Sequence, residues 1–259
     1  MTQSPRTALI TGASSGFGQV YARKLAALGT KLILTARREE PMQALAAELK
    51  VPVRILAADL ATDHGIAAVA HVIRETDTLD LLINNAGFGT KKRFWEADYS
   101  QQEAMHRVHI MATLQLTRAA LEGMVARKRG AVINVSSVAG FIQSQGSISY
   151  CATKTWMNSF TEGLAMELHG AGSPVQVQAL CPGYTHTGFH AAAGVDKSLI
   201  PGWMWLDAEY VVEKSLQGLQ NNQVFVIPDW KYKAAAALMR HLPLSIRRRL
   251  GRPGGDRRT

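Results

Sequence analysis

The glycine-rich octet Thr11-Gly12-Ala13-Ser14-Ser15-Gly16-Phe17-Gly18 separates a short apolar run at residues 8–11 from a helical pattern at residues 18–28. Glycines here allow a tight turn, a close approach of a pyrophosphate to the backbone, and packing of the helix on the strand. The start of the helix also offers unpaired N–H groups and a positive dipole end to phosphates. A plain turn is the alternative, since many loops contain three glycines. We predict a nucleotide site whose cofactor-binding residues here are Gly12, Ser14, Ser15, Gly16, Phe17 and Gly18.

Outward from this octet, short runs rich in Val, Ile, Leu and Ala alternate with helical patterns. The predicted strands are residues 8–11, 31–36, 53–58, 79–84, 131–136, 175–180 and 224–227. Nearly continuous apolar runs are typical of parallel strands that are covered on both faces. Alternating strand and helix units build a doubly wound sheet. We therefore predict an α/β fold: a single doubly wound Rossmann domain at residues 1–228, with a seven-stranded, mostly parallel sheet flanked by helices on both faces.

The composition is that of a globular protein, with 47% hydrophobic and 19% charged residues, and it argues against intrinsic disorder. No apolar run approaches the roughly 20 residues that a membrane span needs. The polar first six residues do not resemble a signal peptide, so we predict a cytoplasmic protein. Two cysteines make no disulfide framework, and no Cys/His cluster has metal-ligand spacing, so we predict no metal site.

The net charge of +9 belongs mainly to residues 229–259, which hold nine basic and two acidic residues. We predict a basic, helical C-terminal extension there, packed on the domain or trailing from it. A solvated or subunit-contacting extension is the favoured interpretation. Weak peripheral contact with an anionic membrane is the alternative, because the extension is basic and amphipathic. Nucleic-acid binding is not predicted, since no recognised module or aromatic platform accompanies the charge.

The end of the second predicted strand bears on the choice of cofactor. An acidic residue at that point would hold the ribose 2′-hydroxyl of NAD. The strand instead ends in Ala36-Arg37-Arg38, and a guanidinium can bind a 2′-phosphate through two parallel hydrogen bonds. The alternative is that both arginines are solvated surface charge. We predict NADPH/NADP⁺ as cofactor, with Arg37 as the residue that selects it.

A second motif, Ser149-Tyr150-Cys151-Ala152-Thr153-Lys154, places Tyr150 and Lys154 four residues apart on one helix face. A free tyrosine titrates near pH 10, but a neighbouring ammonium favours the phenolate and lowers that pKa. Tyr150 could then exchange a proton with a substrate oxygen. Ser137 follows the fifth predicted strand, at the sheet edge where ligands bind in open α/β sheets, and its hydroxyl could orient the same oxygen.

Residues 7–228 resemble the short-chain dehydrogenase/reductase family, and in particular its bacterial, NADP-preferring carbonyl reductase group. The motifs that carry the resemblance are Thr11-Gly12 through Gly18, Asp59-Leu60, Asn84-Asn85-Ala86-Gly87, Ser137, Tyr150, Lys154, Pro182-Gly183 and Thr187. The resemblance implies that Tyr150 is the acid/base, that Lys154 lowers its pKa and holds the nicotinamide ribose, and that Ser137 positions the carbonyl.

The resemblance also implies roles for the remaining motifs. Asp59 and Leu60 would border the adenine, and Asn85, Ala86 and Gly87 would line the cofactor. The carboxamide end would meet the segment that holds Pro182, Gly183, Thr185 and Thr187. Because members of the family commonly form dimers or tetramers, a homodimer or homotetramer is expected.

One position departs from the family pattern. Where the family usually has an asparagine that holds a proton-relaying water, this sequence has His109. A histidine could bond the same water or pass protons itself, which makes His109 a candidate catalytic residue. The alternative is a neutral, buried histidine that only packs.

The resemblance and the motifs together predict an NADPH-dependent oxidoreductase acting on a ketone or secondary alcohol. The segment 184–206, with Phe189, Gly194 and the cluster Trp203-Met204-Trp205, favours a bulky apolar substrate; alternatively its tryptophans only anchor it to the core. A 3-oxoacyl carrier-protein reductase is an alternative, since the +9 charge could attract an acidic carrier. A catalytically inactive NADP(H)-binding regulator is the alternative from another class.

Overall fold

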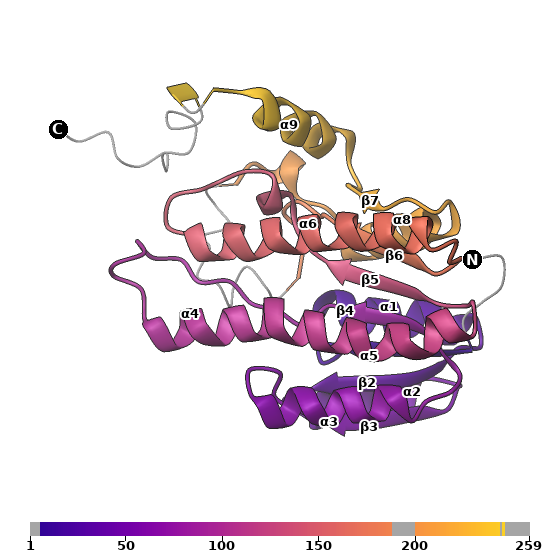
Figure 1. Cartoon of the computed structure of the whole chain (residues 1–259). Coiled ribbons are helices and arrows are strands. Elements are labelled where there is room, and N and C mark those ends of the chain that lie inside the picture. The colour runs from indigo at the N-terminus through magenta and orange to yellow at the C-terminus, as the bar shows by residue number, and fades with distance from the viewer. Residues whose placement is uncertain (1–5, 188–199, 244, 247–259) are drawn as a thin grey trace.

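The computed structural model describes residues 6–187, 200–243 and 245–246. Its centre is one seven-stranded sheet in the order β3-β2-β1-β4-β5-β6-β7, and every neighbouring pair is parallel (Figure 1). The strands are β1 (Thr7–Thr11), β2 (Lys31–Ala36), β3 (Val53–Ala57), β4 (Leu79–Asn84), β5 (Ala131–Val135), β6 (Gln176–Leu180) and β7 (Phe225–Val226). The predicted doubly wound fold is confirmed, with all strands parallel.

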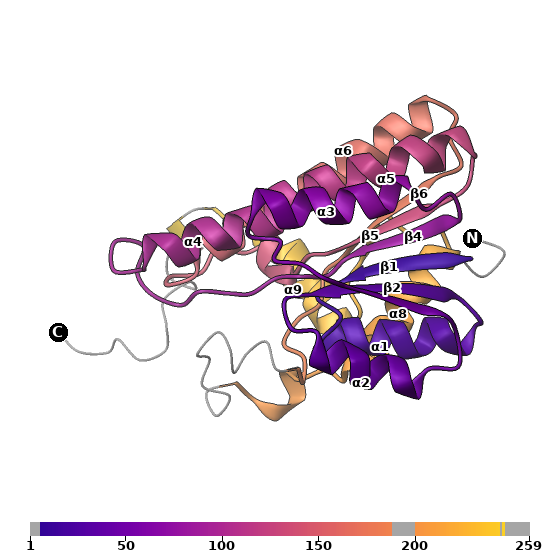
Figure 2. The ribbon, with the colours of Figure 1, turned by 90° about the horizontal axis from the view of Figure 1, so that it is seen from below.

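Helices cover both faces of this sheet (Figure 2). One layer consists of α1 (Gly16–Ala27), α2 (Glu40–Glu48) and α8 (Ala208–Gln220), and α9 (Trp230–His241) joins its core. The opposite layer consists of α3 (Asp63–Arg74), α4 (Tyr99–His106), α5 (Thr113–Ala126) and α6 (Ile148–Gly170). Among the described helices, none has the length and apolarity needed to cross a bilayer.

Alternation along each strand explains why the strands are apolar throughout. In β4, Leu81 and Ile83 pack into the core beneath the α1 layer, whereas Leu82 between them packs into the core beneath the α3 layer. Successive side chains of a strand point to opposite faces, and here both faces are dry. Apolar residues therefore follow one another without a break from Leu81 to Ile83, and the period-2 pattern of a half-exposed strand is absent there.

The strand order decides where the site lies. The chain runs outward from β1 through β2 to β3 and then returns to place β4 against the other side of β1. The loops after β1 and β4 therefore emerge side by side at the carboxyl ends of the strands, which is the switch point where such sheets bind ligands.

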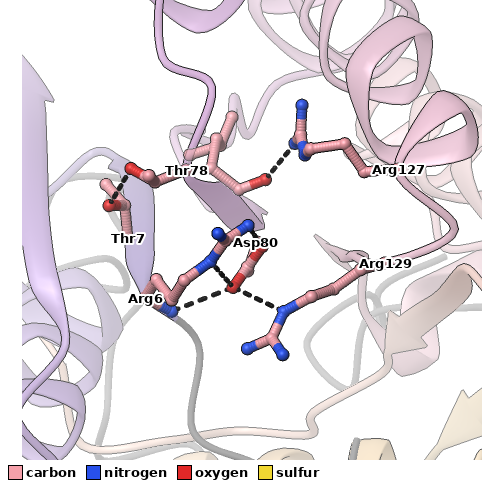
Figure 3. Close-up of polar contacts among 7 residues, drawn as sticks. Arg6, Thr7, Thr78, Asp80, Arg127 and Arg129 are labelled. Atoms are coloured by element: carbon pink, nitrogen blue, oxygen red, sulfur yellow. Dashed lines mark hydrogen bonds and ion pairs between the residues drawn. The ribbon is translucent and has the colours of Figure 1, made fainter.

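The amino end of β4 is fastened by a buried carboxylate (Figure 3). The Asp80 side chain has 0% exposure and accepts hydrogen bonds from Arg6 Nε (3.1 Å), Arg6 Nη2 (3.1 Å) and Arg129 Nε (2.8 Å). Burial by itself would raise the pKa of Asp80, but the hydrogen bonds and charges of the two arginines outweigh it and leave that pKa below its ordinary value. Asp80 thus ties the N-terminal residue of the described chain to the turn before β5.

The described part of the C-terminal extension packs on the domain. The Tyr232 ring of α9 lies against Gly183, where a Cβ atom would stand 2.0 Å from the ring. Its hydroxyl accepts a hydrogen bond from Tyr184 N (3.0 Å) and donates one to Met204 O (2.7 Å). Of the predicted basic extension at residues 229–259, residues 244 and 247–259 lie outside the described residues.

Candidate active site

The glycine octet forms the turn between β1 and α1. Gly12 (φ +68°) and Gly16 (φ +55°) adopt left-handed conformations that favour glycine. A Cβ atom on Gly12 would lie 2.8 Å from Ala86 Cα, and one on Gly18 would lie 2.4 Å from Gly12 O. Ser15 precedes α1 without a side-chain capping bond, so it leaves the first N–H groups of the helix to another acceptor. The turn therefore fits a bound diphosphate.

The loop after β4 is bonded directly to this turn. Thr11 Oγ1 accepts hydrogen bonds from the backbone N–H groups of Asn85 and Ala86, both at 2.9 Å. Asn85 Nδ2 donates to Thr11 O (2.8 Å) and to Gly12 O (3.2 Å). Thr11 was not among the predicted site residues, and its position directly before the first glycine is the signal that could have identified it.

The predicted adenine-side residues lie at the carboxyl ends of β2 and β3. Arg37 follows β2 and is exposed, and within the described residues no carboxylate pairs with its guanidinium. Asp59, also exposed, accepts a hydrogen bond from Ala61 N (3.0 Å), and Leu60 beside it is buried. These strands are neighbours in the sheet, so the structure brings the three predicted residues to one edge.

Ser137 and Tyr150 come together from different elements. Ser137 stands two residues beyond β5, where its Oγ accepts a hydrogen bond from Ala139 N (3.1 Å). Tyr150 lies in the first turn of α6, and Ser137 hydrogen-bonds its side chain. Burial raises the pKa of Tyr150 above its ordinary value, and the bond to Ser137 opposes that shift. The phenol is therefore protonated at neutral pH.

Lys154 lies one turn further along α6 and is buried. Its Nζ donates a hydrogen bond to Val135 O (2.8 Å) and stands 5.7 Å from the centre of the Tyr150 ring. Burial lowers the pKa of Lys154 to about 7. The sequence predicted that this ammonium would lower the pKa of Tyr150. In this structure burial dominates the pKa of both groups, because desolvation penalises the charged phenolate and the charged ammonium alike.

His109 lies in a turn of π-helix (Arg107–Ala112) between α4 and α5 and has 0% exposure. Its ring meets that of Tyr150 edge-on, with centroids 5.9 Å apart. Burial first, and then the nearby charges of Lys154 and His106, hold the pKa of His109 well below its ordinary value. The structure thus places His109 against the catalytic candidates and keeps it neutral.

The segment after β6 completes the site. Pro182 O accepts hydrogen bonds from Val138 N (3.0 Å) and, more weakly, from Ser137 Oγ (3.4 Å). Thr185 is buried, and its hydroxyl donates to Gly183 O (3.0 Å). A Cβ atom on Gly16 would lie 3.4 Å from Thr187 Cβ, so this segment reaches back to the glycine turn.

The predicted substrate segment is described only in part: Phe189 and Gly194 lie outside the described residues. Trp205 is half-buried and stacks on His186, an exposed residue of the same segment, with ring centroids 4.9 Å apart. Trp203 is instead 64% exposed, with Lys231 Nζ 5.4 Å from its ring centre.

Comparison with known proteins identifies the class. The family described as short chain dehydrogenase matches residues 6–197. The chain belongs to this family, and the Rossmann-type sheet and the glycine turn described above are consistent with that membership.

Individual relatives cover most of the chain. A short-chain dehydrogenase from Sphingobium yanoikuyae, solved in complex with NADPH, is 33% identical with a TM-score of 0.81 over 92% of this chain and 97% of that one. The bulky-bulky ketone specific alcohol dehydrogenase from Comamonas testosteroni is 28% identical, with a TM-score of 0.78 over 94% and 97% of the two chains. The 3-oxoacyl-[acyl-carrier-protein] reductase of Aquifex aeolicus is 32% identical over 187 residues, which cover 70% of this chain and 75% of that one.

Proposed function

We propose that this protein is an NADPH-dependent oxidoreductase that reduces a ketone to a secondary alcohol, with Tyr150 as the proton donor. The observation that carries the proposal is the convergence of Ser137 and Tyr150, joined by a hydrogen bond, next to Lys154 and beside the glycine turn. Two hydroxyl groups that meet at the carboxyl edge of a parallel sheet can both donate to one substrate oxygen.

NADPH, when bound, supplies the hydride. The chain would hold its diphosphate at Gly12, Gly16 and the first turn of α1, and its 2′-phosphate at Arg37. Asp59 and Leu60 would border the adenine, and Thr185 and Thr187 would contact the carboxamide. The NADPH-bound relative from Sphingobium yanoikuyae supports this choice of cofactor.

The protonation states support the reductive direction. Because burial raises its pKa, Tyr150 holds its proton at neutral pH and can donate it to a carbonyl oxygen. Ser137 would orient that oxygen. Lys154, with a pKa of about 7, can give or take a proton at neutral pH after the phenol has donated.

A bulky apolar ketone is the substrate class that we favour, in line with the Comamonas testosteroni relative. Reduction of a 3-oxoacyl group on a carrier protein is the second candidate, favoured by the Aquifex aeolicus relative and by the net charge of +9. A regulator without catalysis is disfavoured, since Ser137, Tyr150 and Lys154 are all present and assembled.

The test is NADPH oxidation against steroids, aryl diketones, short ketoesters, sugars and a 3-oxoacyl carrier-protein thioester, with NADH in parallel. Tyr150→Phe should lower turnover by about 100-fold or more, the contribution typical of an acid/base group. Tyr99→Phe is the matched control, because Tyr99 is 78% exposed on α4. Tight NADPH binding without any turnover would favour the regulator instead.

Arg37 decides the cofactor part of the proposal. Arg37→Ala should lower the preference for NADPH over NADH by about 10- to 100-fold, as expected for the loss of a charged hydrogen bond. Arg38→Ala removes the same charge at the adjacent residue and should change the preference for NADPH over NADH little. An unchanged preference in Arg37→Ala would refute the assignment.

We also propose that the protein is a homodimer or homotetramer and that its extension is solvated or contacts a neighbouring subunit, with weak contact with anionic membranes as the alternative. For assembly, Leu114, Val125 and Met166 are exposed apolar residues on the α5–α6 side, and light scattering after gel filtration tests it. For the membrane, α9 exposes Trp230 (71%) and Leu238 (59%) shortly before the basic end of the sequence. Absence of cosedimentation with anionic liposomes at low salt would end that idea.

A further inference from the structure

His109 lies between two segments of the site and bonds to both. Its Nε2 stands 3.2 Å from the backbone nitrogen of Phe88, in the loop after β4. Its Nδ1 stands 2.8 Å from Thr153 Oγ1 on α6. Thr153 Oγ1 in turn lies 2.8 Å from the backbone oxygen of Tyr150. One continuous chain of hydrogen bonds therefore joins the cofactor-side loop to the residue that carries the phenol.

The direction of each bond in this chain is fixed by its first member. The Phe88 N–H can only donate, so His109 Nε2 must be the unprotonated, accepting nitrogen. A neutral imidazole then carries its proton on Nδ1 and donates it to Thr153 Oγ1. The threonine hydroxyl donates its own proton to Tyr150 O. Both ring nitrogens are thus engaged in one tautomer.

Two local features make room for the imidazole. Gly87 has no side chain, and a Cβ atom there would lie 2.6 Å from His109 Nε2. The turn of π-helix at Arg107–Ala112 places His109 where its ring is fully buried. Such turns are frequent at functional sites. A glycine and a π-helical turn both lower local backbone stability, and here both accommodate the His109 ring.

We propose that His109 and Thr153 are positioning residues: a neutral, Nδ1-protonated imidazole ties the Phe88 amide to the Tyr150 carbonyl and holds the phenol in place. This inference rests on the proposed function, because it assumes that Tyr150 is the proton donor. The proposal also excludes His109 from the proton path to Lys154. Both nitrogens of its imidazole are already bonded, one to Phe88 and one to Thr153, so the ring does not pass protons during turnover.

The first test needs no substrate. Nitrogen-15 NMR of protein labelled at histidine, with His109 assigned by its absence in His109→Phe, should show one Nδ1–H tautomer that does not titrate between about pH 5 and 8, the range in which exposed histidines change charge. Two titratable bases face the ring, Lys154 from α6 and His106 from α4, and positive charge on either one opposes protonation of His109. An Nε2–H tautomer or a titrating ring would overturn the proposal.

The second test separates positioning from packing. Thr153→Val keeps the shape of the side chain but breaks the chain at its centre, and should lower kcat by about tenfold, the effect of one hydrogen bond with its partner left unpaired. The KM for NADPH should stay unchanged, and Thr153→Ser should restore kcat. The control is Thr161→Val, which makes the same change on the same helix at a buried hydroxyl that donates to Met157 O and accepts from Asn134 Nδ2. It also leaves one buried partner unpaired, but it lies outside the hydrogen-bond chain through His109. That variant should keep its kcat.

The third test asks whether the two residues act together. His109→Phe keeps a ring but loses both bonds, so it should lower kcat as Thr153→Val does, and the double variant should be no worse than either single one. Each variant should lower kcat by the same factor at every pH, without moving a limb of the pH–rate profile. Full activity in His109→Phe and Thr153→Val, or a lost limb in His109→Phe, would overturn the proposal.

The outcomes also separate this inference from the proposed function. Turnover by the wild type with no effect of Thr153→Val would overturn the positioning role and leave the reductase intact. If His109 has the Nδ1–H tautomer but the protein turns over no ketone, the proposed reductase activity is refuted. The role of the His109–Thr153 bonds in positioning Tyr150 for catalysis is then refuted too.

Discussion

Asp80→Asn should lower the free energy of unfolding by about 2–3 kcal/mol. The Asp80 carboxylate is fully buried and accepts three side-chain hydrogen bonds from Arg6 and Arg129. Breaking a fully buried ion pair costs about 3–5 kcal/mol. Here the side chains of Arg6 and Arg129 are 49% and 32% exposed, so water still solvates them after the change, and asparagine keeps one acceptor oxygen. Both facts place the loss below the buried-pair range.

The assay is unfolding by urea and by heat at pH 7, where we expect the midpoint temperature to fall by about 4–10 °C for a domain of this size. Asp77→Asn is the control, because Asp77 is an exposed carboxylate in the turn before β4. A loss below about 0.5 kcal/mol, the usual range of a surface substitution, would refute the reasoning.

The pH dependence of the same variant follows from the lowered pKa of Asp80. A carboxylate whose pKa is lower in the folded state stabilises the fold above its unfolded pKa of about 4, and that stabilisation disappears as the pH falls through the folded value. The difference between wild type and Asp80→Asn should therefore be constant from neutral pH down to about 5 and shrink below about 4. If the difference in the free energy of unfolding persists in acid, packing around Asp80, and not its charge, stabilises its contacts with Arg6 and Arg129.

Two further predictions concern the site and the extension. Burial lowers the pKa of Lys154 to about 7. Between pH 7 and the unfolded pKa of about 10.4, the unfolded chain therefore binds more protons than the folded protein. The free energy of unfolding without cofactor should rise with pH across that interval, and Lys154→Met should flatten the rise. Tyr232→Phe removes the hydrogen bonds that the Tyr232 hydroxyl makes with Tyr184 N and Met204 O. This loss should cost about 1–3 kcal/mol and speed hydrogen exchange at the Tyr184 amide. Unchanged exchange would show that these two bonds do not hold α9.

Local patterns were sufficient to predict the fold and the catalytic candidates. The glycine turn, the apolar strands and the four-residue spacing of Tyr150 and Lys154 are signals contained within a few residues. Ser137 follows the carboxyl end of β5 and Tyr150 lies in the first turn of α6, and the fold brings the two together at that edge of the sheet. Arg37 could also be placed from sequence, because the end of β2 is a local boundary.

The bonds across the fold could not be predicted in the same way. Thr11 and Asn85, Asp80 and Arg129, and His109 and Thr153 are pairs separated by 74, 49 and 44 positions. Which of them meet depends on strand order and register, and a sequence pattern contains neither. For this reason the sequence alone does not choose between the relay and packing alternatives for His109, and in the structure its ring bonds two segments at once.

By itself, then, the sequence determined the doubly wound class, and it predicts the nucleotide turn and the groups that exchange protons, because turn chemistry, periodicity and helix spacing are properties of neighbouring residues. Only the tertiary structure decided the state of those groups. Burial raises the pKa of Tyr150, lowers that of Lys154 and keeps His109 neutral, because desolvation depends on what the whole fold places around a side chain.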